Sequence, residues 1–272
     1  MRFRAVLLCI VAGVAGASAA FERQAESGRA LGLGCTGVAL DGLPWGSSAN
    51  PALIGSIDRL TVGFSYAPDT FGLRELSRAA ATAIIPMAGG SGGLRFSRFG
   101  FDLYREVQGS LAFGMAITDQ LSVGLAVSFF HLAILRYGSA SAIGVDAGAL
   151  VRLTPEVHWG AVVTNINSPS LASGSEKLPR TIGTGIAWTP LPDLLVSVEL
   201  TKDVRFPAEF HAGVAYKPVS LVELRGGTTQ DPSTVNAGVG IHYLILTLDY
   251  AFTSHPELGM SHHFSLTITP GD

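Results

Sequence analysis

The stretch LILTLDYAF, residues 244–252, constrains the fold most strongly because it places one carboxylate in the middle of an apolar run. In a buried or membrane-spanning helix, Asp249 would be a charge in low dielectric, which costs several kcal/mol unless the charge is paired. In a β-strand, successive side chains point to opposite faces. Leu246, Leu248 and Tyr250 then share an apolar face, and Asp249 lies on the other face. The stretch therefore predicts a strand that is apolar on one face.

The same alternation recurs along the chain from residue 58 onward. Leu121, Val123 and Leu125, for example, alternate with Ser122 and Gly124. Segments of about ten residues are separated by turns rich in Gly, Pro, Asp and Ser, which is the pattern of a transmembrane barrel. The sequence predicts fourteen strands, at 58–67, 78–87, 92–102, 105–118, 120–134, 140–154, 156–166, 180–191, 193–203, 207–219, 220–230, 233–243, 244–254 and 261–270.

Composition supports a membrane barrel over other folds. The chain is 47% apolar and 14% charged, whereas an ordinary globular domain has roughly 25% charged residues. After residue 20 there is no apolar run long enough for a spanning helix, and a closed barrel is the other fold that satisfies its backbone in lipid. A two-sheet sandwich also uses alternating strands, but its polar face would carry many Lys, Glu and Asp. We expect an all-β fold, an antiparallel transmembrane β-barrel of about 14 strands.

The N-terminal part of the chain differs from the rest. Its first twenty residues, MRFRAVLLCIVAGVAGASAA, have the layout of a cleavable secretory signal, and the apolar core is short for the alternative, an uncleaved membrane anchor. Residues 21–57 lack alternation and contain seven glycines, which allow close backbone packing in a limited space. We predict a signal peptide at 1–20, a plug-like segment at 21–57 and a transmembrane barrel at 58–272, located in the cell outer membrane.

Charged residues on the small-residue face of the predicted strands are candidates for the barrel lumen. No spacing links them into a nucleophile and base, so we predict no catalytic residue and no enzymatic activity. Mutual ion pairing inside a narrow barrel explains them better. The candidate lumen residues are Asp146, Arg152, Glu199, Glu223, Arg225 and Asp249.

Two further patterns do not predict a cofactor or metal site. Residues 32–37, GLGCTG, match the dinucleotide fingerprint, but the flanking sequence provides neither the buried strand nor the helix that the site requires. His262 and His263 are adjacent on a strand and point to opposite faces, so they cannot easily share a metal. A net charge of −3 without a Lys/Arg run argues against nucleic acid as a partner.

Several motifs resemble a known family of barrels. The segment GRALGLGCTGVALDGLPWGSSANPALIG, residues 28–55, resembles the start of FadL-like outer-membrane barrels, where a Gly-rich segment ends in an Asn-Pro-Ala motif, here Asn50, Pro51 and Ala52. RFGFDLYRE, RYGSA, TNINSP, LPR and the closing stretch DYAFTSHPELGMSHHFSLTI, residues 249–268, resemble the PorV/PorQ branch of that superfamily. The resemblance implies a fourteen-stranded barrel with the N-terminal segment folded into the lumen as a plug.

The resemblance leaves two functions open. FadL-type members pass hydrophobic compounds across the outer membrane, and this implies a channel for small hydrophobic solutes. PorV-type members serve type IX secretion, and this implies a scaffold that holds secreted protein cargo. The chain is shorter than typical members of either branch and does not end on an aromatic residue. The expected partners are therefore outer-membrane lipid and either a hydrophobic small molecule or a protein cargo.

Overall fold

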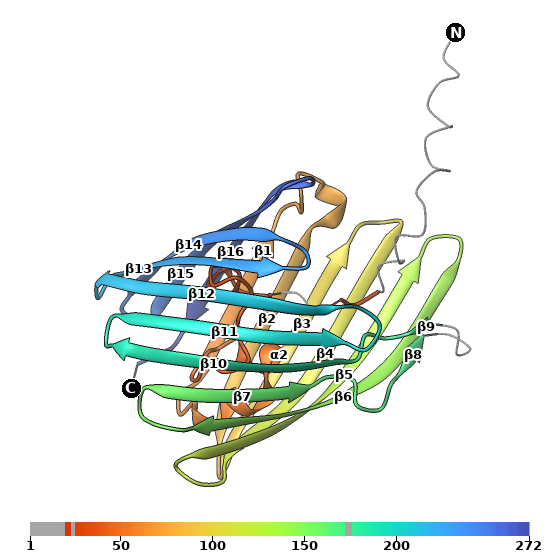
Figure 1. The fold of residues 1–272 in the computed structure, drawn as a ribbon. Coiled ribbons are helices and arrows are strands. Elements are labelled where there is room, and N and C mark those ends of the chain that lie inside the picture. The colour runs from red at the N-terminus through yellow and green to blue at the C-terminus, as the bar shows by residue number, and fades with distance from the viewer. Residues whose placement is uncertain (1–19, 23–24, 172–175, 272) are drawn as a thin grey trace.

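The computed structural model describes residues 20–22, 25–171 and 176–271, so the predicted signal peptide lies almost entirely outside the described residues. Fourteen antiparallel strands close into one barrel, with β1 paired to both β2 and β16 (Figure 1). The wall strands are β1 (Thr61–Ala67), β2 (Arg78–Met87), β3 (Gly90–Gly100), β4 (Tyr104–Ala116), β5 (Leu121–Ile134), β6 (Gly138–Arg152), β7 (Val157–Val163), β10 (Thr181–Leu191), β11 (Leu194–Asp203), β12 (Ala208–Val219), β13 (Val222–Gln230), β14 (Thr234–Tyr243), β15 (Leu246–His255) and β16 (Gly259–Ile268).

The barrel predicted from the alternation is confirmed. Each of the fourteen expected segments coincides with one wall strand, and the ends differ by three residues or fewer. Arg95 does not interrupt β3, because its side chain points into the lumen and pairs with Glu26. Each strand pairs with its sequence neighbours in the wall, so the whole sheet follows from consecutive hairpins and the closure between Phe64 and Leu266.

The connection between β7 and β10 includes the polar stretch at residues 167–180. This connection contains a second, two-stranded sheet formed by β8 (Ser170–Leu171) and β9 (Glu176–Lys177). Leu171 and Leu178 are buried in a cluster with Phe130 and Leu132 of β5. Two leucines inside a polar sequence thus fold part of the connection onto the wall, because burying their side chains stabilises an ordered conformation.

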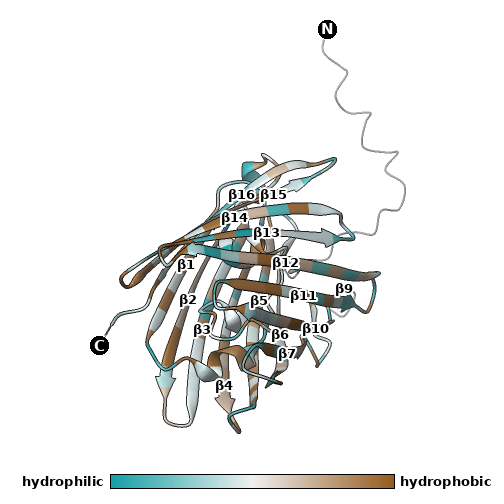
Figure 2. Cartoon of the chain, turned by 60° about the vertical axis from the view of Figure 1, so that its left-hand side comes forward, coloured by the Kyte–Doolittle hydropathy of each residue, from teal (hydrophilic) through white to brown (hydrophobic). Residues whose placement is uncertain are grey.

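The two faces of the wall differ as the sequence predicts. On β5, Leu125 and Phe129 face outward and are 61% and 50% exposed, whereas Ser128 faces the lumen and is buried. On β15, Leu248 is 50% exposed while Asp249 is buried at 3%. Figure 2 shows the resulting interleaving of apolar and hydrophilic residues along the wall strands. The carboxylate of the opening stretch therefore faces the lumen, and its leucines face outward.

The two ends of the barrel carry connections of different length. The end at which β1 begins and β16 ends has short turns, such as residues 88–89, 192–193 and 220–221. The opposite end carries the longest connections, residues 68–77 with the 3₁₀ helix η2 (Arg74–Leu76), and residues 164–180. We call these the turn end and the loop end.

Residues 25–57, which we call the lumen segment, run inside the ring of wall strands (Figure 1). The segment contains α1 (Gly28–Gly32), α2 (Gly46–Ala49) and the 3₁₀ helix η1 (Pro51–Ser56). The Ser27 hydroxyl caps α1, and the Asn50 side chain caps η1 with Pro51 in its first turn, which are residue types suited to these positions. Helix α1 packs against β13–β16, and η1 packs against β3–β6. Among the described residues, no helix is long and apolar enough to cross a membrane.

Candidate functional site: the barrel lumen

An ion-pair network holds α1 to the wall. Arg225 on β13 pairs with Glu223 through Nε at 2.6 Å and with Asp249 on β15 through Nη1 at 2.6 Å, and its side chain is fully buried. Arg29 of the lumen segment reaches the same Glu223 carboxylate at 3.1 Å. Lys217 approaches Glu223 from the wall at 3.5 Å. The structure thus brings three of the predicted lumen residues together and adds a cation from the segment.

Glu199 on β11 binds the next part of the segment through its backbone. Its Oε2 accepts hydrogen bonds from the backbone N–H groups of Gly37 at 2.7 Å and Val38 at 2.9 Å. The Thr201 hydroxyl donates to the other carboxylate oxygen at 3.2 Å. The buried carboxylate therefore satisfies two backbone donors of a chain section that has no sheet or helix partner of its own.

Arg152 at the turn end of β6 binds Asp41 of the segment. The guanidinium donates to Asp41 Oδ2 through Nη2 at 2.7 Å and through Nε at 2.8 Å, a two-bond contact. Arg152 also donates to the Ser122 hydroxyl at 3.1 Å. Asp146, by contrast, accepts from the backbone N–H of Asn165 at 2.7 Å and thereby holds the connection after β7, so it belongs to the loop-end mouth of the barrel.

The Asn-Pro-Ala motif is the most deeply packed part of the segment. Asn50 is fully buried and donates from Nδ2 to the carbonyls of Val38 and Ala149, both at 2.9 Å. Its Oδ1 accepts from the Ala52 backbone N–H at 3.0 Å. Glycines in the wall permit this approach: a Cβ at Gly148 would collide with the Asn50 amide, and a Cβ at Gly124 with the Pro51 carbonyl. Pro51 and Ala52 are likewise buried.

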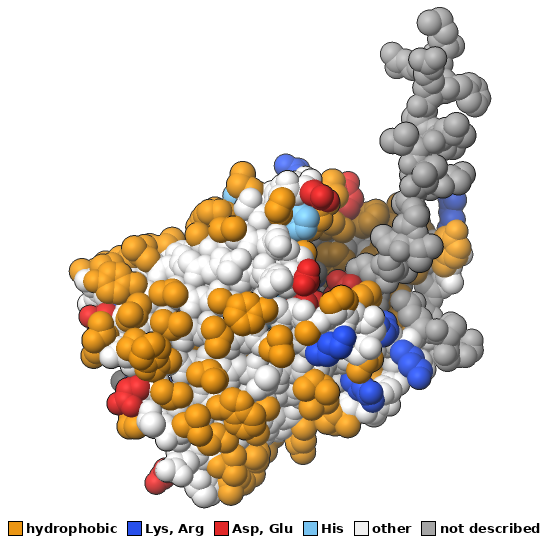
Figure 3. Space-filling view, in the orientation of Figure 1, with side chains coloured by type: hydrophobic (Ala, Val, Ile, Leu, Met, Phe, Trp, Pro, Cys, Tyr) orange, Lys and Arg blue, Asp and Glu red, His pale blue; other side chains and the backbone are white. Residues whose placement is uncertain are grey.

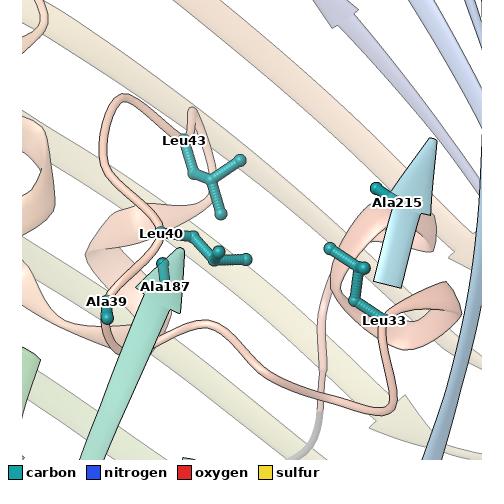
Figure 4. Packing of buried hydrophobic residues seen from close by; sticks show 6 residues of the cluster. All are labelled: Leu33, Ala39, Leu40, Leu43, Ala187 and Ala215. Atoms are coloured by element: carbon teal, nitrogen blue, oxygen red, sulfur yellow. The ribbon is translucent and has the colours of Figure 1, made fainter. Parts of the chain in front are cut away.

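Apolar contacts complete the attachment near the turn end. Leu33, Leu40 and Leu43 of the segment are buried against the wall alanines Ala187 of β10 and Ala215 of β12. Figure 4 shows Leu40 and Leu43 above Ala187, and Leu33 beside Ala215. Small wall residues leave room for the leucines, so the lumen face is complementary in shape as well as in charge.

The lumen segment also contacts the wall at the loop end, through residues that were not among the predicted site residues. Glu26 pairs with Arg95 of β3, and the Phe21 backbone N–H donates to Glu106 Oε2 of β4 at 3.1 Å. The Phe21 ring packs edge-on to Phe130 at 5.0 Å between centroids. The charged residues of the N-terminal segment could have predicted these contacts, because each charge in a barrel lumen requires a partner of opposite sign.

Two cavities lie on opposite sides of the segment. The loop-end cavity is bounded by Glu26, Ser47 and Ser48 of the segment and by Arg78, Arg95, Glu106 and Phe130 of the wall. The turn-end cavity is bounded by the segment residues Arg29, Leu40 and Asp41 and by His158, Leu195, Lys217 and Glu223 of the wall. The segment therefore lies between two hollows that together follow the barrel axis.

The lumen contains no recognisable metal site within the described ranges. No group of three or more His, Cys, Asp or Glu side chains is placed to hold a metal ion in that part of the chain. His263 faces the lumen and lies 3.2 Å from the Glu26 carbonyl, whereas His262 contacts the Tyr250 hydroxyl at 2.9 Å on the other face. Adjacent histidines therefore point to opposite faces, as expected for a strand.

Comparison with known proteins identifies the fold. The toluene transporter TbuX of Ralstonia pickettii aligns with a TM-score of 0.72 and 13% identity over 92% of this chain and 100% of its own. The monoaromatic hydrocarbon channel CymD aligns with a TM-score of 0.67 and 14% identity over 93% and 100%. A Pseudomonas aeruginosa FadL homologue gives 0.64 and 12% over 89% and 98%. The chain matches no protein-family model and no curated protein. At these identities the likeness shows a shared fold, that of FadL-type barrels.

Proposed function

We propose that the chain is an outer-membrane channel for small hydrophobic solutes. A closed barrel with an outward apolar face suits a lipid surrounding, because all backbone groups pair between strands. Barrels of this fold include proteins described as toluene transporters and a monoaromatic hydrocarbon channel. The observation that carries the proposal is the lumen segment, which separates two cavities along the barrel axis.

The proposed function divides the chain into three parts. Residues 1–20 are the signal peptide, residues 21–57 the plug, and residues 58–272 the transmembrane barrel. External loops are the longer ones in outer-membrane barrels, so we place the loop end outside the cell and the turn end in the periplasm. The resting lumen is closed by the segment, and passage requires the segment to shift relative to the wall contacts of Arg29, Asp41 and Asn50.

An apolar hollow on the outside of the wall supports a hydrophobic solute. It lies over β1–β6 and is lined mainly by apolar side chains, including Leu94, Phe96 and Leu111. Arg95 and Ser110, whose side chains contact each other on the lumen face, also border the hollow. A small residue, Gly109, faces outward at this point. An apolar solute at the loop-end cavity thus has an apolar surface close by, on the lipid side of the wall.

The second candidate is a PorV/PorQ-type scaffold for secreted protein cargo. It rests on the resemblance of the closing stretch, residues 249–268, and on no feature of the lumen. The connection between β7 and β10 is the longest one between wall strands, so a protein cargo at the loop end would meet β8 and β9. The transport proposal is favoured because the lumen contacts and cavities have no role in a pure scaffold.

Uptake of radiolabelled toluene by Gram-negative cells expressing the chain tests the proposal. The native chain should raise uptake several-fold above cells without it. Gly109→Trp should reduce that gain by more than half, because the indole would fill the outer hollow, where no atom lies within 4 Å of a Cβ at Gly109. Gly226→Trp is the matched control, since its Cβ also meets open space but on β13, away from the hollow. A folded native chain that gives no gain contradicts transport of this solute.

A further inference from the structure

The outward face of several strands changes from apolar to basic as the strand approaches the loop end. On β3, the exposed side chains of Leu94 and Phe96 are followed by exposed Arg98. On β11, exposed Val198 and Leu200 are followed by exposed Lys202. The same order holds on β4, which runs in the opposite direction and carries exposed Arg105 as its second residue. It also holds on β10, which exposed Arg180 directly precedes.

The cations form two groups on the rim. Arg98 and Arg105 lie on paired strands, because Arg98 is opposite Val107 and Arg105 is opposite Gly100. The connection carrying Arg136 is joined to the same region by a hydrogen bond from the Leu135 N–H to the Leu103 carbonyl at 2.9 Å. Arg98 also borders the mouth of the loop-end cavity.

The second group belongs to β10 and β11. Lys202 is opposite Ile182, and the Arg180 carbonyl accepts from the Val204 N–H at 3.2 Å, so the two cations are diagonal neighbours. Figure 3 shows basic side chains gathered toward the right-hand, loop-rich end of the visible wall, beyond the apolar field. We call Arg98, Arg105, Arg136, Arg180 and Lys202 the basic arc.

The opposite rim of the same strands has the opposite sign. The turns that join β4 to β5, β6 to β7 and β10 to β11 expose Asp119, Glu156 and Asp193. Within the basic arc, Asp102 is an exposed carboxylate beside three arginines, so that group keeps an excess of positive charge. Arg205 is outside the arc because Asp203 neutralises it at 3.0 Å. On these strands, the exposed charge therefore changes sign from the loop end to the turn end.

We propose that the basic arc binds the phosphate groups of the phosphorylated glycolipid in the outer leaflet of the outer membrane. The cations lie where the apolar belt ends, which is the level of lipid head groups. Arg98, Arg105 and Lys202 are on the outward face of their strands, in line with exposed apolar side chains. Arginine suits phosphate because its guanidinium donates two parallel hydrogen bonds. Exposed carboxylates at the other rim would repel the same head groups. This inference uses the orientation given under Proposed function and does not depend on solute transport.

Native mass spectrometry of the full chain in detergent tests the proposal. The probes are purified bis-phosphorylated lipid A and the same lipid with its phosphates removed. The native chain should retain the phosphorylated probe at least fivefold better than the dephosphorylated one. Each cation near an anionic head group contributes about 1 kcal/mol, which is about fivefold. The triple variant Arg98→Gln, Arg105→Gln, Arg136→Gln should therefore lose tenfold or more of its affinity for the phosphorylated probe.

The control is the variant Arg59→Gln, which removes an exposed cation at the turn end. It should retain the phosphorylated probe as the native chain does.

Heat-modifiable gel migration checks that each variant is folded, and single Gln variants replace the triple one if it does not assemble. Equal retention of the two probes by the native chain overturns the proposal. An equal loss in the triple variant and the control also overturns it. Toluene uptake is read separately, so failure of transport leaves this test intact.

Discussion

The outward and lumen faces of one strand show how differently neighbouring residues are constrained. On β13, Leu224 faces outward and is 49% exposed, whereas Arg225 faces inward and its side chain is fully buried. Leu224 needs only to be apolar, because lipid accepts any apolar shape. Arg225 contacts Glu223 and Asp249 in fixed geometry, and Glu223 also holds Arg29 of the segment. The outward face thus needs only apolar side chains for contact with lipid, whereas the lumen face needs particular side chains that bind the lumen segment.

Arg225→Leu, a substitution on the lumen face, should cause the largest loss of folded-state stability. The substitution leaves the buried Glu223 and Asp249 carboxylates without their shared cation, and breaking a buried ion pair in this way costs about 3–5 kcal/mol. Thermal loss of the heat-modifiable folded form is the measurement. Leu224→Ala on the same strand should change that stability by less than about 1 kcal/mol, since its side chain is only half-buried. Similar losses for the two variants would remove the distinction between the faces.

Leu248→Arg and Thr247→Arg compare the two faces of β15 by adding an arginine to each. A lipid-facing arginine costs about 2–4 kcal/mol near the midplane of a bilayer, whereas a lumen-facing arginine remains near polar groups. Thr247 contacts His242 at 3.2 Å inside the lumen. Assembly efficiency in the outer membrane, read as the folded fraction on a gel, should fall more for Leu248→Arg. The reverse order would show that the register of β15 is wrong.

Glu199→Gln should produce the smallest of the three effects. The amide keeps one acceptor for Gly37 or Val38 but loses the charge that strengthens both bonds, a change of about 1–2 kcal/mol. Hydrogen exchange of residues 37–38 should accelerate while exchange of β11 stays unchanged. Glu209→Gln, a neighbouring substitution whose carboxylate is 39% exposed, is the control. Unchanged exchange at residues 37–38 would show that Glu199 does not hold the segment.

The wall was predictable from the sequence because its signal is local. A period of two in side-chain polarity marks each strand, and each strand pairs with its neighbour in the chain, so the count and order of strands followed directly. Arg95, which interrupts the apolar pattern of β3, was compatible with a strand because its partner Glu26 lies in the lumen. The turn at Leu244 lies outside β15 for a local reason as well, since its backbone has a positive φ of 51°.

The lumen contacts were less predictable because their partners are distant in sequence. Six wall charges could be placed on the lumen face, but Arg29 and Glu223 are 194 residues apart, and no local pattern joins them. Side-chain alternation predicts the face of a residue but not its partner. Asp146 faces inward, yet it binds the connection at Asn165 rather than the lumen segment. The small sheet of β8 and β9 lies beside two leucines, Leu171 and Leu178, that pack against β5, which is also a distant contact.

Solute leakage through the reconstituted barrel tests the central claim most directly. The variant lacking residues 25–50 loses the contacts at Glu26, Arg29 and Asn50 and keeps all the wall strands. In liposomes, this variant should release a small trapped dye several-fold faster than the full-length chain, because the two cavities then join into one pathway. A variant that assembles with normal heat-modifiable migration and leaks no faster than the full-length chain would contradict the account. The wall side chains alone would then close the lumen, and the scaffold function would be favoured over transport.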